Sequence, residues 1–509
     1  MACRWVKSVN LVEPVSEASS DDQVNEILYE WFEGLGDTDY GTDFYDLSWE
    51  NADEADKLFL ADTTWRDDPD YLGEDLSSAL MEIDKVPTVY RAKAPMFITQ
   101  RFTSIASFDN EKVLDDFDFS DKADRLLGLF RMWNVVEYYY PYLNVLDKEW
   151  IDVLDEMIPI MLDGTDEHSY CMAMEHFTAQ LQDAHALYGY AGVLEEYGDY
   201  RAPVSLVRAE GQYVVNYMYK DCDLQIGDVI ISVNGTPIED IIEEQKQYIS
   251  ITEDDKILNQ MEAFILRAKE PDIDIMVRRG ENEVSVNILG MSLEEEWQIE
   301  KGKEKEPYEV LDHNIGLINP IVLTDNEISN VMKKVEETER LIIDLRQYPN
   351  NGKWISTLAE YLKTEETPFC KNISISPAIP GAYLTNCIQT SGGKQVSYHY
   401  KKPVVILMNE RSQSLAEYTI MMYRGGENVV VMGSNSVGSD GEITYLYAPE
   451  GNILQFTGAG MLTAEGEQTQ RIGLSPDIYV EPTISEIREG KDELIEAAVQ
   501  YIVNKTLIK

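Results

Sequence analysis

The feature that most constrains the fold is the regular alternation of short apolar runs with amphipathic helical segments from Ile315 onward. The apolar runs are Ile315–Ile318, Leu341–Leu345, Val404–Met408 and Val429–Met432, and the helical segments between and after them are 327–335, 355–362 and 415–423. Apolar strands that alternate with helices are typical of a largely parallel sheet covered by helices. We therefore predict an α/β domain over residues 307–509, closed by a helix from about Ser485 to Val503.

The rest of the 509 residues is too long to share that one core, so we expect several domains. Residues 1–120 are acidic and aromatic and predict an N-terminal extension of mixed structure. Residues 121–200 show apolar side chains at helical spacing, which predicts a helical domain. Residues 202–290 read as short strands and turns, with a tight turn at Asn234-Gly235 and a helix from Ile238 to Ile249. Residues 292–306 are charged and predict a linker.

Composition and motifs exclude several functional classes. The chain has 93 acidic and 42 basic side chains, and its formal charge of −51 disfavours binding to nucleic acid or anionic membranes. The sequence contains no run of 18 apolar residues, so no membrane span is expected. Five scattered cysteines and the absence of HExxH, GxGxxG and GxxxxGK[ST] patterns disfavour a disulfide framework, a metal enzyme and a nucleotide enzyme. We expect no cofactor and no metal.

Ser414 is the leading candidate for chemistry. It lies in the segment from Asn409 to Glu417, between the apolar run Val404–Met408 and the helical run that starts at Leu415. A serine at such a joint exposes its hydroxyl close to the free N–H groups of the new helix, which suits a nucleophile. The alternative is that Ser414 caps the helix, and from this segment alone the two interpretations are equally good.

Six segments in order resemble one family. They are Leu181-Gln182-Asp183-Ala184-His185, Gly227–Gly235, Ile343-Asp344-Leu345-Arg346, Ser414-Leu415-Ala416-Glu417, Gly433–Gly438 and Gly473–Asp477. Together they resemble the C-terminal-processing and tricorn-type serine peptidases, and residues 60–118 resemble an N-terminal extension of some bacterial members. The resemblance implies a multidomain α/β fold: an N-terminal helical unit, a PDZ-like β-rich domain and a crotonase-like peptidase core.

A serine nucleophile needs a base to accept its proton. One branch of the family uses a lysine about 25 residues after the serine, but that position is Ser439 and no lysine lies between Lys402 and Lys491. The tricorn-like branch uses a histidine from the N-terminal side of the core, and His185 occupies that place. The other histidines, His168, His176, His313 and His399, are expected to be structural.

The resemblance also assigns supporting residues. The family's glutamate before the last motif is replaced by Gln470, which we predict as an orienting residue for His185. Asp183 is close in sequence, with helix capping as its alternative role. The oxyanion hole is expected from the backbone N–H of Leu415 and that of Gln347 or Tyr348, because Pro349 has no N–H. Arg346 is expected to form an ion pair, and the polar loop Ser439-Asp440-Gly441 to line the cleft.

The sequence thus predicts a serine peptidase that cleaves peptide or protein substrates through an acyl-enzyme on Ser414. The alternative is a catalytically inactive protein on the same fold that binds peptides or apolar ligands. An acyl-CoA enzyme is disfavoured, since it would need neither the Ser–His pair nor the PDZ-like insert. The PDZ-like domain suggests peptide capture by strand addition or gating of the cleft. The family suggests an extracytoplasmic setting, although no signal peptide is visible; the compartment, like the oligomeric state, stays open.

Overall fold

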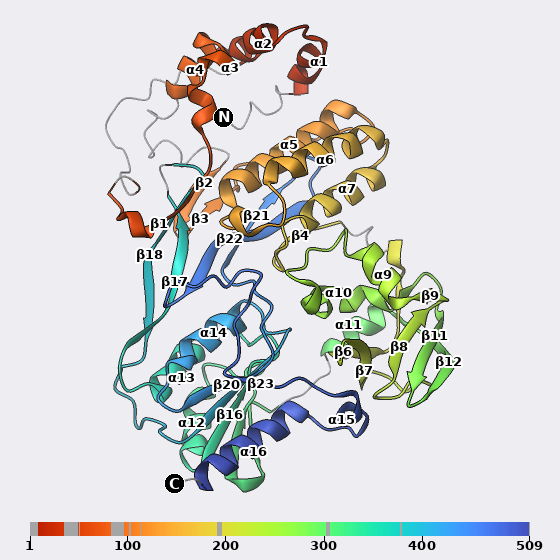
Figure 1. Cartoon of the computed structure of the whole chain (residues 1–509), viewed down its shortest axis with the longest axis vertical. Helices are drawn as coiled ribbons and strands as arrows, with labels where there is room; N and C mark the ends of the chain where they lie inside the picture. Colours follow the sequence, from red (N-terminus) through yellow and green to blue (C-terminus); the bar gives the residue numbers. More distant parts are fainter. Residues whose placement is uncertain are drawn as a thin grey trace.

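The computed structural model describes residues 9–34, 49, 51–82, 96–100, 103–111, 113–190, 196–301, 306–376 and 379–507 (Figure 1). Parts of the acidic extension expected at residues 1–120, including 1–8, 35–48 and 83–95, lie outside these ranges. The described part of the extension contains α1 (Val9–Glu17), α2 (Asp21–Glu33), α3 (Pro69–Leu72), α4 (Glu74–Met81), β1 (Lys57–Leu60), β2 (Phe97–Gln100) and β3 (Ser104–Ser107). No helix in the described ranges has both the length and the apolar character needed to cross a bilayer.

Three helices form the unit predicted after residue 121. They are α5 (Lys122–Tyr139), α6 (Trp150–Asp163) and α7 (Glu167–Ala179). Asp121 starts α5 because its carboxylate accepts the backbone N–H groups of Ala123 and Asp124. The apolar faces of these helices pack in one core with Leu454 and Phe456, which belong to a strand far along the chain. The helical unit is therefore fixed directly onto the C-terminal part of the protein (Figure 1).

The β-rich unit follows. Its strands are β5 (Tyr200–Arg201), β6 (Val204–Ala209), β7 (Gln212–Met218), β8 (Val229–Val233), β9 (Thr236–Pro237), β10 (Arg267–Ala268), β11 (Asp272–Arg279), β12 (Asn282–Leu289) and β13 (Met291–Ser292), and its helices are α9 (Ile238–Gln245), α10 (Ile257–Ile265) and α11 (Leu293–Lys301). The main sheet has the order β12-β11-β8-β7-β6. Asn234 and Gly235 form the predicted turn, with φ of 48° and 83°.

Two expectations for this region were wrong. The helix expected to reach Ile249 ends at Gln245, and residues expected to form a charged linker form α11. The acidic run Glu294–Glu296 lies in the first turn of α11, where negative charge favours a helix N-terminus. Charge alone therefore did not distinguish a linker from a solvated helix.

The predicted parallel sheet is present. Its order is β14 (Tyr308–Leu311), β15 (Ile315–Ile318), β16 (Arg340–Asp344), β19 (Val404–Met408), β20 (Val429–Gly433) and β23 (Ile478–Tyr479), and all neighbours except β14 and β15 are parallel. Ile406 and Met408 pack toward α12 (Ile328–Glu336), α13 (Trp354–Leu362) and α14 (Leu415–Arg424). Val405 and Leu407 pack toward α16 (Glu493–Leu507) on the other face.

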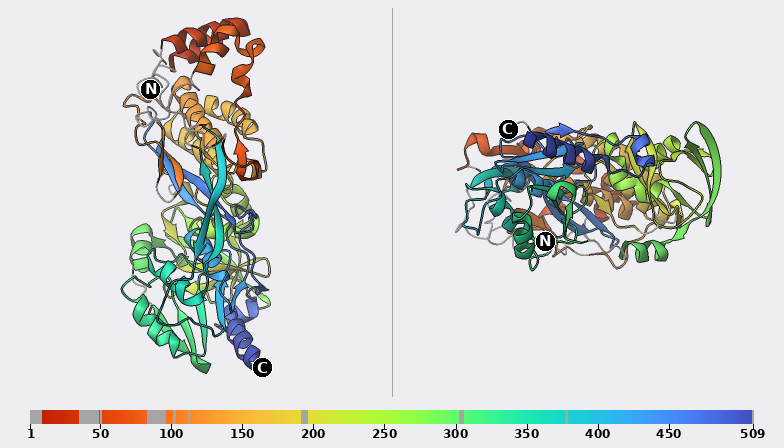
Figure 2. Two further views of the ribbon diagram at one scale, coloured as in Figure 1. Left: turned by 90° about the vertical axis from the view of Figure 1, so that its left-hand side faces the viewer. Right: turned by 90° about the horizontal axis from the view of Figure 1, so that it is seen from below.

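A second sheet was not predicted. Its strands are β17 (Thr367–Ile375), β18 (Ala382–Ser391), β21 (Glu442–Tyr447) and β22 (Ile453–Thr463), joined by β1 and by β4 (Leu187–Tyr188). In the side view of Figure 2 the molecule is elongated, and β17 and β18 (teal) run between the helical unit and the parallel sheet. The pairing of β4 with β22 brings the segment after His185 against the C-terminal half of the chain.

The last expected helix is two helices. α15 (Ile484–Arg488) and α16 are separated by Gly490, whose φ of 70° a helix cannot contain.

Candidate active site

Ser414 lies at the end of the turn between β19 and α14. Its φ of 54° and ψ of −115° place it in the left-handed region, which costs a non-glycine residue about 1–3 kcal/mol. The turn is anchored to the residue that follows β16, since Ser412 Oγ donates to the carbonyl of Leu345 at 2.7 Å. Ser414 keeps 8% of its surface exposed. A strained, partly exposed serine between a strand and a helix is the arrangement that hydrolases use for a nucleophile.

Glu417 holds this turn to a second loop. Its fully buried carboxylate accepts the N–H of Ser414 at 2.9 Å and the N–H of Ser439 at 3.1 Å through Oε2. Oε1 accepts the N–H of Gly438 at 2.8 Å and the hydroxyl of Ser436 at 2.5 Å. Burial raises the pKa of Glu417, and the four donors oppose that rise. Glu417 therefore does more than place negative charge in the first turn of α14. Its hydrogen bonds hold the backbone of Ser414 close to the backbone of Ser439.

His185 lies in a turn after α7 and is buried, with 7% of its surface exposed. Its Nδ1 lies 2.9 Å from Thr457 Oγ1 and 3.1 Å from Ser439 Oγ. Its Nε2 has no hydrogen-bond partner among the described residues. Burial lowers the pKa of His185, and the nearby Asp183 carboxylate partly offsets this. The imidazole is therefore neutral at pH 7.

Asp183 is the centre of the network behind His185. Its fully buried carboxylate accepts the hydroxyl of Ser439 at 2.6 Å and the backbone N–H of Thr457 at 2.8 Å. Its Oδ1 also lies 3.9 Å from His185 Nδ1. Gln470 Nε2 donates to Asp183 Oδ1 at 3.1 Å and makes no hydrogen bond to the imidazole. Gln470 therefore reaches His185 only through Asp183, which differs from the direct contact expected for an orienting residue.

The network favours one tautomer of His185. The Ser439 hydroxyl directs its proton to Asp183, so its oxygen lone pair is available to Nδ1. A proton on Nδ1 leaves the lone pair on Nε2, the atom without a partner. Such an imidazole is oriented and prepared to accept a proton at Nε2.

The segments that carry Ser414 and His185 are in contact. Gln413 Nε2 donates to the carbonyl of Ala184 at 3.0 Å, which joins the residues just before the two candidates. The backbone N–H of Ser414 also lies 3.0 Å from the carbonyl of Ser439, whose hydroxyl contacts His185. No hydrogen bond joins Ser414 Oγ to the imidazole itself, although both residues are described.

A cavity of about 480 Å³ opens beside Ser414. Leu415, the first residue of α14, lines it, and so does Tyr348, which is 56% exposed. Both candidates for the oxyanion hole thus belong to the wall that contains Ser414. Asp440 and Gly441 of the expected polar loop also line this cavity, whereas Ser439 is buried and does not. Arg346 instead forms ion pairs with Asp344 and Asp492.

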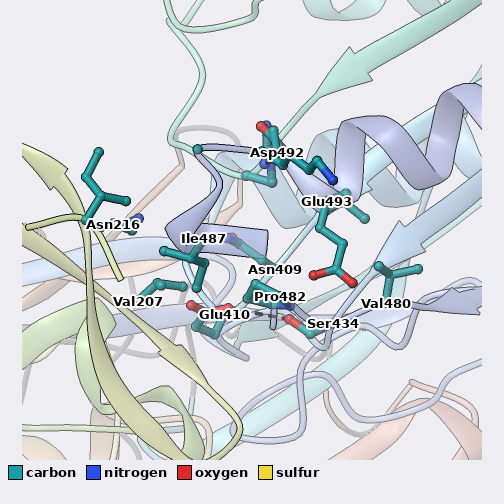
Figure 3. Close-up of a pocket in the computed structure, with 15 residues that line it drawn as sticks. Val207, Asn216, Asn409, Glu410, Ser434, Val480, Pro482, Ile487, Asp492 and Glu493 are labelled. Carbon is teal, nitrogen blue, oxygen red and sulfur yellow. Dashed lines mark hydrogen bonds and ion pairs between the residues drawn. The ribbon is translucent and has the colours of Figure 1, made fainter. Parts of the chain in front are cut away.

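The same turn borders a second cavity, of about 350 Å³ (Figure 3). Glu410 lines this cavity together with Ser434, and Val207 and Asn216 contribute to it from the β-rich unit. Ser414 does not line it. The turn therefore presents Glu410 to one cavity and Ser414 to the other.

The β-rich unit contacts the turn directly. In α10, Gln260 Nε2 donates to the carbonyl of Ala184 at 2.8 Å, and Asn259 Nδ2 donates to Gln413 Oε1 at 3.0 Å. Arg411 forms an ion pair with Glu262 at 2.6 Å. One helix thus touches the neighbours of both His185 and Ser414.

The other histidines make their contacts elsewhere. His168 contacts the hydroxyl of Tyr190, His176 the carbonyl of Gln247 and His399 the carbonyl of Glu360, while His313 lies in a short turn before β15. Thr457 and the side-chain role of Ser439 were missed in the sequence. Thr457 lies in β22, which no motif marked. The described residues contain no group of three or more His, Cys, Asp or Glu side chains able to hold a metal ion.

Comparison with known proteins matches two parts of the chain to families. Residues 199–297 match the PDZ domain, and residues 314–480 match peptidase family S41. The chain is 30% identical over 92 residues to a carboxy-terminal-processing protease of Bartonella bacilliformis, covering 18% of this chain and 21% of that protein. It is 24% identical over 183 residues to the carboxy-terminal processing protease CtpA of Bacillus subtilis, covering 34% of this chain and 36% of that protein.

The fold also matches a solved structure. Mature CPAF in complex with lactacystin superimposes with a TM-score of 0.57 at 13% identity, over 75% of this chain and 99% of that one. The expected fold class, a mixed α/β protein with a PDZ domain and a peptidase core, is confirmed. Residues 314–480 are therefore similar to peptidase family S41, and the segment ahead of them is similar to a PDZ domain.

Proposed function

We propose that this chain is a serine peptidase in which Ser414 is the nucleophile and His185 is the general base. The observation that carries the proposal is the convergence of a strained Ser414 and a neutral, oriented His185 on Ser439. The match of residues 314–480 to peptidase family S41 supports the reaction class. The absence of lysine from the segment after Ser414 supports histidine as the base.

In the proposed reaction, Ser414 Oγ attacks the scissile carbonyl and His185 Nε2 takes its proton. The imidazolium then donates that proton to the leaving amine, and the acyl group stays on Ser414 until water releases it. Asp183, through Ser439, offsets the charge on the imidazolium; Gln470 and Thr457 hold Asp183 in place. The backbone N–H groups of Leu415 and Tyr348 are the proposed donors to the oxyanion.

The proposal requires a movement of Ser414 or His185. Because no hydrogen bond joins Ser414 Oγ to His185 here, substrate binding has to bring Nε2 within about 2.6–3.2 Å of the hydroxyl. Looser geometry without substrate is common in such sites. The unpartnered Nε2 leaves the imidazole free to make that bond.

The test compares Ser414→Ala with Ser356→Ala, a serine that lines the same cavity. Hydrolysis of a denatured protein substrate and covalent labelling by a fluorophosphonate are measured for both variants. We expect Ser414→Ala to lose both and Ser356→Ala to keep both. Labelling and cleavage that survive in Ser414→Ala refute the nucleophile, and a wild-type protein that shows neither is a binding protein on this fold.

A further inference from the structure

The wall of the cavity beside Ser414 includes the carboxyl group of Asp440, which is buried. Asp440 is 2% exposed, and its Oδ1 accepts the backbone N–H of Gly441 at 2.8 Å. Its Oδ2 has no hydrogen-bond partner among the described residues. A buried oxygen without a partner is costly in a folded protein, so it marks a place where a ligand group is expected.

Apolar side chains form much of the cavity that contains Asp440. Its lining includes Ile355, Tyr418, Met422 and Met461, together with the polar residues Asn351, Ser356 and Glu442 and the residues of the candidate active site. These side chains provide a surface for an aliphatic or aromatic stem, whereas Asp440 provides a buried carboxyl oxygen without a hydrogen-bond partner, and Glu442 is a second acidic residue of the lining. A long side chain with an apolar stem and a polar end matches this combination.

The charged residues near Asp440 indicate which charge a ligand group should carry. Asp440 lies beside Glu417, and no Lys, Arg or His side chain among the described residues is within 4.0 Å of either carboxyl group. Glu417 has four donors and Asp440 has one, so Asp440 is the member of the pair that keeps a proton while the cavity is empty. Burial and the Glu417 charge raise the pKa of Asp440 well above its usual range. A ligand cation would replace that proton.

The charge of the whole chain acts in the same direction. At −51, it attracts cationic peptides and raises their local concentration. We propose that this cavity is the specificity pocket for the substrate residue whose carbonyl Ser414 attacks, and that it takes a lysine or arginine side chain with its charged end at Asp440. The inference rests on the proposed peptidase function and adds the substrate class to it.

The experiment uses the full chain and four peptides that differ only at this substrate position, which is lysine, arginine, leucine or norleucine. We expect wild-type kcat/KM to be roughly 10- to 100-fold higher for lysine and arginine than for norleucine, which lacks the charge. In Asp440→Asn the lysine peptide should lose most of this advantage, and the norleucine peptide should change by less than about threefold. Glu410→Gln, which changes the unpartnered carboxyl in the other cavity, should keep the preference.

Fluorophosphonate labelling separates failure of this inference from failure of the proposed function. A wild type that labels at Ser414 but prefers norleucine or leucine, or an Asp440→Asn variant with an unchanged lysine preference, overturns the inference and leaves the peptidase. Absence of both labelling and cleavage in the wild type overturns both. If Asp440→Asn does not fold, protection of wild-type Ser414 from labelling by n-butylammonium but not by 1-pentanol supports the pocket, and equal effects overturn it.

Discussion

Replacing Glu417 with glutamine tests whether this buried carboxylate builds the candidate active site. Each of its oxygens accepts two hydrogen bonds. An amide has only one acceptor oxygen. If its NH₂ group replaces Oε2, it faces two backbone N–H groups and two hydrogen bonds are lost. If it replaces Oε1, it faces the N–H of Gly438 and the Ser436 hydroxyl, which can turn to accept, so one hydrogen bond is lost. Hydrogen bonds to a charged group are worth about 1.5–3 kcal/mol each, so the second orientation, which the amide should adopt, gives a gross loss of about 1.5–3 kcal/mol.

The amide also avoids the cost of burying a charge, the effect that raises the pKa of Glu417. We therefore expect the lower end of the range, about 1.5 kcal/mol, as loss of stability. Because the Gly438 N–H loses its anchor, and the N–H groups of Ser414 and Ser439 keep only an uncharged acceptor, we also expect fluorophosphonate labelling of Ser414 to slow by roughly 100-fold.

Denaturant unfolding and labelling kinetics on the same preparations measure both effects. Glu410→Gln is the control, since this carboxylate lies on the same turn but has one hydrogen bond, of 3.4 Å from Ser434. It should be destabilised by less than about 1 kcal/mol. If Glu417→Gln is as stable as the wild type and labels at the same rate, the reasoning about this carboxylate is refuted.

Three further predictions concern protonation and the PDZ contact. Burial lowers the pKa of His185, so a neutral base persists to lower pH and kcat/KM should fall only below pH 6.5; a fall centred above pH 6.5 would exclude His185 as the titrating base. Burial raises the pKa of Glu175 to about 9. Between pH 4.5 and 9 the folded chain therefore keeps a proton on Glu175 that the unfolded chain has lost. The free energy of unfolding should fall as pH rises through that window. Glu175→Gln should remove this decline, which is up to about 1.4 kcal/mol per pH unit. The measurement is the free energy of unfolding between pH 6 and 8, and the same pH dependence in the wild type and the variant would contradict the prediction. Glu262→Gln, which breaks the ion pair with Arg411, should lower kcat/KM by roughly tenfold, whereas Glu295→Gln in an exposed pair should change it by less than twofold; equal effects would mean that the PDZ contact does not support the turn.

Much of the fold could be predicted because it depends on local patterns. The parallel strands, the helices that cover them and the turn at Asn234-Gly235 all follow from apolar spacing or from turn residues. The second sheet could not be predicted in this way. Although β17 and β18 are neighbours in sequence, β17 also pairs with β22 and β18 with β1, which lie far away along the chain. α10 was missed as well, although it carries the PDZ contacts to the turn.

The same distinction applies to the site. Motifs identified Ser414 and His185 as candidates, and the structure brings their segments together. The residues behind His185 come from separate strands and loops, so spacing gave no sign that Thr457 would contact the imidazole or that Gln470 would contact Asp183. Asp440 was recognised only as part of a polar loop. A sequence does not show that its Oδ2 is buried or that this oxygen has no hydrogen-bond partner among the described residues.

The most direct test of the central claim is the site and rate of fluorophosphonate modification, followed by peptide mapping of the intact chain. We expect one adduct, on Ser414, and a rate that falls by at least about 100-fold in His185→Ala, since general-base catalysis contributes roughly 10²- to 10⁴-fold. An adduct on another residue, or an unchanged rate without the imidazole, would contradict the claim that His185 activates Ser414.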